Sequence, residues 1–229
     1  MKKMIIIISI LLISMEISAQ EPVTIKTDNY TFSNNIGRSS TVMENGDLVT
    51  NTVTYLKEGY ATTTYHDFED KLATPLILEF PEDILGGIIV AQDEEQDISL
   101  IKLLRKPKGS IEIEIADLTS KKNITIIGYP YRYSEKSHVK GIRTVIQGGE
   151  IFLETKNRGF IDFNVVSGFS GSGIFNEQGQ LLGMITGSVA NNTKNQTNIR
   201  NLGGEPRALM SMFVKSTYLN SLIVNQMSY

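Results

Sequence analysis

A serine flanked by glycines lies in a tight turn between two apolar runs. Residues 167–173 read SGFSGSG and separate Ile161–Val166 from Gln180–Ile185. A sharply bent backbone presents a hydroxyl beside several converging N–H groups, which is what a hydrolytic nucleophile and its oxyanion hole require. Small residues also gather in hairpin turns for conformational reasons, so the motif alone leaves an ordinary turn open.

A histidine and an aspartate earlier in the chain could complete this chemistry. Gly59–His66 reads GYATTTYH and precedes a polar turn, and Asp97 begins the alternating segment DISLIKL. A histidine base held by a carboxylate is what activates a serine nucleophile. Taken singly, a histidine after a threonine-rich strand such as His66 is more often a surface or half-buried residue than a catalyst, and Asp97 equally fits an ordinary strand-initiating aspartate. The other histidine, His138, stands in a basic loop, and two histidines without cysteine predict no zinc site.

In this order, these segments resemble the trypsin-like, chymotrypsin-fold serine peptidases, most closely their bacterial HtrA-like and glutamyl endopeptidase types. The resemblance extends over about residues 50–223. It rests on Gly59–His66, the segment from Asp97, the turn Ile127–Pro130 and Gly168–Ser172.

The resemblance implies a role for each candidate residue. Ser170 attacks the peptide carbonyl to form an acyl-enzyme, His66 takes and returns the proton, and Asp97 orients the imidazole. Among the serines of the turn, Ser170 alone has a glycine two residues before it. The N–H groups of Gly168 and Ser170 would form the oxyanion hole. The implied activity is a serine endopeptidase that needs no cofactor.

The resemblance also places a primary specificity pocket. Asn164 stands at its base, where an aspartate would select Lys or Arg, and Met184–Ser188 lacks the histidine typical of glutamyl endopeptidases. A neutral pocket favours cleavage after small or medium apolar residues. The implied pocket residues are Asn164, Val165, Val166, Ser167, Thr186, Gly187 and Ser188. The adjoining stretch 189–206 is either a substrate-shaping loop or a surface insertion.

The alternation of short Val/Ile/Thr/Tyr-rich runs with polar turns predicts an all-β protein. The expected strands are residues 48–56, 60–65, 76–79, 87–91, 98–103, 123–128, 141–148, 150–153, 159–164, 172–176, 181–186 and 208–214. Ser216 can then cap a C-terminal helix at about 216–226, where Leu219, Leu222 and Ile223 recur at helical spacing.

The resemblance implies two packed six-stranded antiparallel β-barrels, which the chain length accommodates. We expect the first barrel at about residues 20–110 and the second at about 120–215, with a linker inside about 106–122. The catalytic residues would meet between the barrels. The chain runs only about sixty residues past Ser170, so we expect no PDZ domain of the kind that HtrA proteins usually carry.

The N-terminus has the form of a secretory signal peptide, residues 1–19. Met1–Lys3 is charged, Met4–Ser14 is apolar, and cleavage after Ala19 leaves a peptidase domain at 20–229. The apolar run is short for a membrane span, so we expect export to the periplasm or the medium without a stable anchor; an uncleaved anchor is the alternative.

The amino-acid composition limits the classes of partner that we expect the exported chain to bind. It holds no cysteine, so no disulfide stabilises it, and its net charge of −3 offers no basic field for nucleic acid. We expect polypeptide substrates and no nucleic acid, and the sequence leaves the oligomeric state open.

Two other functions remain open at this point. Phe169 stands where animal proteases carry the aspartate that pairs with a newly freed N-terminus, and where the bacterial branch commonly has Asn. An oxyanion loop collapsed around Phe169 would leave a catalytically silent protein that binds peptides or a partner through the same cleft. An unrelated exported β-sandwich used for adhesion would instead place His66, Asp97 and Ser170 far apart.

Overall fold

The computed structural model describes residues 30–42, 48–69, 72–73, 75–117, 123–130, 144–148, 151–154, 156–161, 165, 168–189 and 210–228. The expected signal peptide, the loop around His138 and residues 190–206 lie outside them. No helix within these ranges is both long and apolar enough to cross a membrane.

The first half of the chain forms a closed antiparallel barrel in the order β1-β2-β3-β6-β5-β4. A 3-10 turn, η1 (Ser33–Asn35), leads into it. The strands are β1 (Ile36–Val42), β2 (Leu48–Lys57), β3 (Tyr60–Thr63), β4 (Pro75–Phe80), β5 (Asp83–Asp93) and β6 (Ile98–Leu103). Its interior is filled by side chains such as Val53, Tyr55, Phe68, Leu78 and Ile101, all of them inaccessible to solvent.

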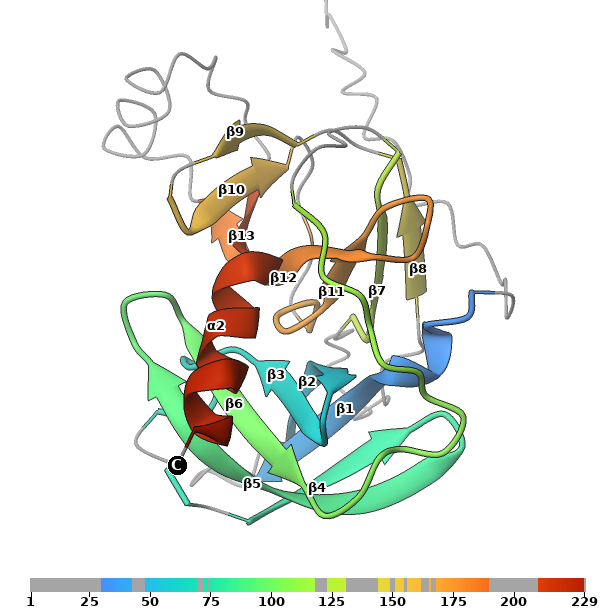
Figure 1. Cartoon of the computed structure of the whole chain (residues 1–229), viewed down its shortest axis with the longest axis vertical. Coiled ribbons are helices and arrows are strands. Elements are labelled where there is room, and N and C mark those ends of the chain that lie inside the picture. The colour runs from blue at the N-terminus through green and yellow to red at the C-terminus, as the bar shows by residue number, and fades with distance from the viewer. Residues whose placement is uncertain are drawn as a thin grey trace, which may run out of the picture.

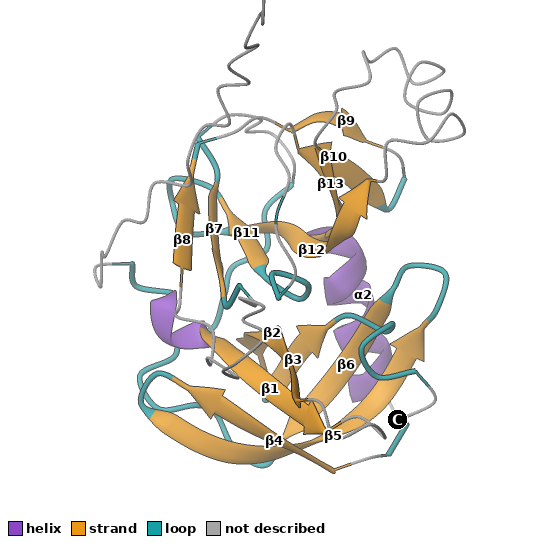
Figure 2. Cartoon of the chain, turned by 180° about the vertical axis from the view of Figure 1, so that it is seen from behind, coloured by secondary structure: helices purple, strands orange, loops and turns teal. Residues whose placement is uncertain are grey.

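The second half forms a seven-stranded antiparallel sheet in the order β8-β7-β11-β12-β13-β10-β9. The strands are β7 (Thr125–Gly128), β8 (Thr144–Gln147), β9 (Ile151–Glu154), β10 (Arg158–Ile161), β11 (Gly173–Phe175), β12 (Leu181–Val189) and β13 (Met210–Lys215). The edge strands β8 and β9 follow each other in the chain. Figure 2 shows the sheet stacked on the first barrel.

The helix α2 (Ser216–Met227) runs from the end of β13 across both halves (Figure 1). Its buried residues Leu219 and Ile223 join a core that combines Leu56 and Leu100 of the first barrel with second-sheet residues such as Leu181. The linker after β6 contributes backbone bonds to both halves: the Ile113 N–H donates to Leu56 and the Leu181 N–H donates to Glu114. The two halves therefore share a hydrophobic cluster, in addition to the core that each half encloses by itself.

The predicted all-β, trypsin-like fold with a short C-terminal helix is confirmed; of the two expected six-stranded barrels, the first is a closed barrel and the second half forms a sheet. Three details differ from the sequence expectations. Strand β1 was not expected, the second sheet has seven strands in the described ranges, and Ser216 makes no side-chain cap. The Ser216 hydroxyl instead donates to the Ala116 carbonyl at 3.0 Å, which fixes the end of the linker.

Candidate active site

His66 and Asp97 lie side by side at one end of the first barrel. Strands β3 and β6 pair antiparallel with Thr63 opposite Ser99, so the residues after β3 meet those before β6. The His66 Nδ1 lies 2.8 and 3.0 Å from the two oxygens of the Asp97 carboxylate. One of these oxygens also accepts the backbone N–H of His66 at 2.9 Å. Asp97 therefore fixes both the ring and the main chain of the histidine.

The electrostatics of the imidazole involve a second carboxylate. The hydrogen bond to Asp97 raises the pKa of His66 above 6.5, partial burial opposes this, and the charge of Asp67 raises it further. The His66 Nε2 lies 3.4 Å from Asp67 Oδ1, and the Thr64 hydroxyl bonds the other Asp67 oxygen. Burial raises the pKa of Asp67 itself. With 47% of its side chain exposed, His66 remains accessible to a substrate.

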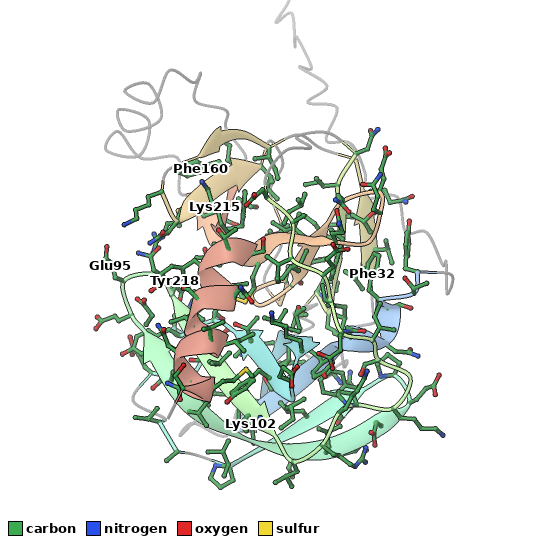
Figure 3. All side chains as sticks on the ribbon, in the orientation of Figure 1. Phe32, Glu95, Lys102, Phe160, Lys215 and Tyr218 are labelled. Atoms are coloured by element: carbon green, nitrogen blue, oxygen red, sulfur yellow. The ribbon has the colours of Figure 1, made fainter. Side chains whose placement is uncertain are left out.

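The turn that carries Asp97 is held by the second half of the molecule. Asp97 has a φ of 59°, and its N–H donates to the Glu94 carbonyl at 3.2 Å. Figure 3 shows Tyr218 of α2 beside the turn that contains Glu95. The Tyr218 hydroxyl donates to the Asp93 carboxylate, which raises the pKa of Tyr218 to about 12. Arg158 of β10 also donates to the Glu95 carbonyl.

The glycine-rich turn around Ser170 rests on strand β2 of the first barrel. The Thr52 N–H donates to the Ser170 carbonyl at 3.1 Å, and the Thr52 hydroxyl donates to the Gly168 carbonyl at 2.7 Å. The Thr54 hydroxyl donates to the Gly171 carbonyl at 2.8 Å. Strand β2 pairs with β3, which leads to His66, so the turn lies against the strands that position the histidine.

The exposure of the turn distinguishes its serines. Ser170 is partly exposed, whereas the Ser172 hydroxyl is fully buried beneath Gly128. The Phe169 ring is 2% exposed and packs in the core of the second sheet with Ile174 and Phe213. Alternation along the turn therefore directs Phe169 inward and leaves Ser170 at the surface.

Two amide groups of the turn belong to the predicted oxyanion hole. Gly168 has a φ of +94°, which glycine adopts without strain. Within the described residues, the N–H groups of Gly168 and Ser170 donate to no acceptor, and no hydrogen bond joins Ser170 Oγ to His66. Hydrogen bonds between catalytic groups are often long in unliganded enzymes and tighten when substrate binds.

Part of the predicted specificity pocket lies in described regions. Val165 is buried, its N–H accepted by Ser211 Oγ at 2.8 Å and its carbonyl bonded by Ser188 Oγ at 3.0 Å. Thr186 is buried at a register shift in β12, and a Cβ on Gly187 would meet no atom within 4 Å. Asn164, Val166 and Ser167 lie outside the described residues.

No group of three His, Asp or Glu side chains that could bind a metal occurs in the parts of the chain that are described. The site therefore consists of an imidazole–carboxylate pair and a glycine-rich serine turn, positioned between a closed barrel and a second sheet. This combination defines the class of serine hydrolases with two packed β-domains.

Comparison with known proteins identifies the family. The sequence model of the trypsin-like peptidase domain matches residues 53–184, more than half of the chain, and the protein belongs to this family of serine endopeptidases. The match spans His66, Asp97 and Ser170. It confirms the resemblance noted from the motifs and excludes the unrelated β-sandwich. Sequence comparison with curated proteins gives no match.

Solved structures share the fold at low sequence identity. The serine endoprotease from Yersinia pestis aligns with a TM-score of 0.61 and 18% identity over 85% of this chain and 63% of its own. The active form of Rv3671c protease from M. tuberculosis aligns with a TM-score of 0.60 and 13% identity, over 82% of this chain and 79% of that one. An inactive form of Rv3671c aligns with a TM-score of 0.59 and 12% identity, over 84% and 86%.

Four groups of the site were not predicted from the sequence. These are the Asp67 carboxylate, the β2 threonines, Tyr218 and Arg158. Asp67 adjoins His66 in the chain and could have been noticed as an acidic neighbour of the base. The others are brought to the site only by tertiary packing, as with the 116 residues that separate Thr52 from Gly168.

Proposed function

We propose that the protein cleaves peptide bonds with Ser170 as nucleophile, His66 as general base and Asp97 as the group that orients the base. The bidentate contact of Asp97 with His66 Nδ1 carries this proposal, because it leaves Nε2 as the nitrogen that receives the serine proton. The free N–H groups of Gly168 and Ser170 would bind the oxyanion of the tetrahedral intermediate, which collapses to an acyl-enzyme that water hydrolyses.

The proposed substrates are polypeptides cleaved after small or medium apolar residues, by a protein exported to the periplasm or the medium. The neutral Thr186 and Ser188 beside Gly187 offer no opposite charge to a buried Lys, Arg or Glu side chain. Desolvating such an unpaired ion costs several kcal/mol. Mass-spectrometric mapping of cut sites in a denatured protein mixture tests this, and a dominant preference for charged residues before the cut would overturn it.

Labelling with a fluorophosphonate tests the catalytic assignment directly. The mature protein is expected to react at Ser170, and Ser170→Ala to lose both labelling and about 10⁶ in turnover. Ser172→Ala is the matched control, because its hydroxyl is buried two residues away and labelling should persist. Labelling at another serine would refute the assignment. Peptide binding without labelling would instead favour a catalytically silent protein. The position of Asp67 Oδ1, 3.4 Å from His66 Nε2, is compatible with this alternative.

A further inference from the structure

Three carbonyl groups of the nucleophile turn are bound by two threonines of one strand. Gly168, Ser170 and Gly171 all accept hydrogen bonds from Thr52 or Thr54 of β2. Residues two apart on a strand point to the same face, so both hydroxyls reach the turn together. The closed barrel thus presents a polar edge matched to the turn of the other half.

The Thr52 hydroxyl has a defined direction. It accepts the backbone N–H of Tyr129 at 2.9 Å, so its single proton is available to the Gly168 carbonyl. The Thr52 carbonyl in turn accepts the hydroxyl of Thr63, three residues before His66, at 2.9 Å. Thr52 is therefore bonded to the nucleophile turn and to the strand that leads to the histidine.

These contacts hold the two peptide units on either side of the unit that carries the Ser170 N–H, because the Thr52 hydroxyl bonds the Gly168 carbonyl and the Thr52 N–H bonds the Ser170 carbonyl. The peptide unit between Ser170 and Gly171 has its carbonyl on Thr52 and its N–H on the Ile185 carbonyl at 2.8 Å. The unit between Phe169 and Ser170 has its carbonyl on the Ser172 N–H, at 2.9 Å. Because a peptide N–H points opposite to its carbonyl, the N–H of Ser170 points away from the Ser172 N–H that the carbonyl of its own peptide unit accepts.

The burial of the threonines indicates that the hydroxyls serve this contact. Thr52 and Thr54 are both inaccessible to solvent. A buried hydroxyl is costly unless it is hydrogen-bonded, and valine would fill a strand of this kind equally well.

We propose that Thr52 and Thr54 are positioning residues that hold the turn with the N–H groups of Gly168 and Ser170 available to the oxyanion. This inference rests on the proposed function and extends it, because it assigns the shape of the oxyanion hole to side chains of the opposite barrel. Neither threonine touches the substrate.

Threonine-to-valine variants test this with almost no change in side-chain volume. We expect Thr52→Val to lower kcat about 10- to 100-fold at nearly unchanged KM, since complete loss of an oxyanion donor costs about 10²- to 10³-fold and a misplaced donor loses only part of that. We expect Thr54→Val, which leaves the Tyr129 amide paired, to act in the same direction with a smaller factor. Thr52→Ser keeps the hydroxyl and should retain kcat within about threefold.

The control is Thr62→Val, a buried threonine opposite Thr54 whose hydroxyl bonds the Ser99 carbonyl at 3.4 Å within the first barrel. Its kcat should equal that of the wild type. All rates are divided by the concentration of active sites titrated with a fluorophosphonate, so partial misfolding lowers the titre and leaves kcat per site unaffected.

A peptide boronate, whose tetrahedral anion occupies the oxyanion hole, separates positioning from structure. Its inhibition constant should rise by the same factor by which kcat/KM falls in each variant. If titrated Thr52→Val keeps wild-type kcat and boronate affinity, the inference is wrong; should that variant fail to fold, the same result with Thr54→Val refutes it. Failure of the wild type to label at Ser170 would overturn the proposed function as well, whereas normal labelling with unchanged variants would overturn this inference alone.

Discussion

Replacing Gly171 by alanine tests how closely the nucleophile turn rests on the first barrel. Gly171 follows the proposed nucleophile directly and has a φ of +87°. A Cβ at this position would lie 1.9 Å from the Thr52 carbonyl oxygen and 2.8 Å from the Thr63 hydroxyl. The nearest obstacle is backbone of a central barrel strand, which no side-chain rotation can relieve.

The expected loss of stability has two parts. An L-residue held at positive φ costs about 1–2 kcal/mol. The turn must also move by about 1.5 Å, the step from 1.9 Å to an ordinary contact of 3.4 Å, which breaks the three hydrogen bonds from β2. At about 0.5–1.5 kcal/mol for each bond, the total with the backbone term becomes about 2.5–6.5 kcal/mol. A displacement of this size at the nucleophile should also lower kcat at least about 10²-fold.

Gly148→Ala is the matched control for the backbone term. Gly148 has a φ of +94°, but a Cβ there would meet nothing within 4 Å, so only the cost of about 1–2 kcal/mol should appear. Urea unfolding of both variants, with activity per titrated site, separates the two terms. Equal destabilisation of the two variants, with normal turnover in Gly171→Ala, would show that the turn does not rest on β2.

Two further predictions concern the base and the turn that supports it. The value of kcat/KM between pH 5 and 9 should rise through a midpoint above 6.5, because Asp97 raises the pKa of His66. The variant Asp67→Asn should move that midpoint to lower pH, because the charge of Asp67 also raises this pKa. An unchanged midpoint in the variant would show that Asp67 does not influence the pKa of the base. Since the pKa is raised on folding, protonated His66 stabilises the fold below pH 6.5, and this contribution disappears as the pH rises through the folded-state pKa. Tyr218→Phe should lower the free energy of unfolding by about 1–2 kcal/mol and reduce kcat, because Asp93 loses its hydrogen-bond donor. The control Ser221→Ala, on the same helix, should change the free energy of unfolding by less than about 0.5 kcal/mol. Equal unfolding curves for the two variants would refute a role for Tyr218.

Most strands were predictable from the sequence because they pair apolar runs with polar turns. The segment Ile98–Leu103 matches its prediction at both ends, and the other expected strands differ at their boundaries. Strand β1 was not predicted from the sequence, because its residues, IGRSSTV, are polar in the middle of the strand. Its register is set by pairing with β2 and β4. A barrel-closing strand of this kind depends on partners, which an apolar pattern does not reveal.

The candidate site also contains residues that were predictable from the sequence and residues that were not. His66 and Asp97 were predictable because each stands at the end of a recognisable strand, and antiparallel pairing brings those ends together. The contacts of Thr52, Thr54 and Tyr218 join residues more than a hundred positions apart, so no local pattern contains them. The place of Phe169 was likewise not predictable from the sequence, because its ring packs in the core of the second sheet with Ile174 and Phe213.

Each half of the molecule supplies one part of the candidate site and positions the part supplied by the other. The first barrel carries His66 and Asp97, and its β2 threonines hold the turn of Ser170. The second half carries Ser170, and through Tyr218 and Arg158 it holds the turn that ends at Asp97. A change in the packing between the halves therefore disturbs the base and the nucleophile together, even where both sheets remain folded. The geometry of the candidate site is in this sense a property of the interface, which explains why buried threonine hydroxyls and partly buried carboxylates lie along it despite the cost of burial.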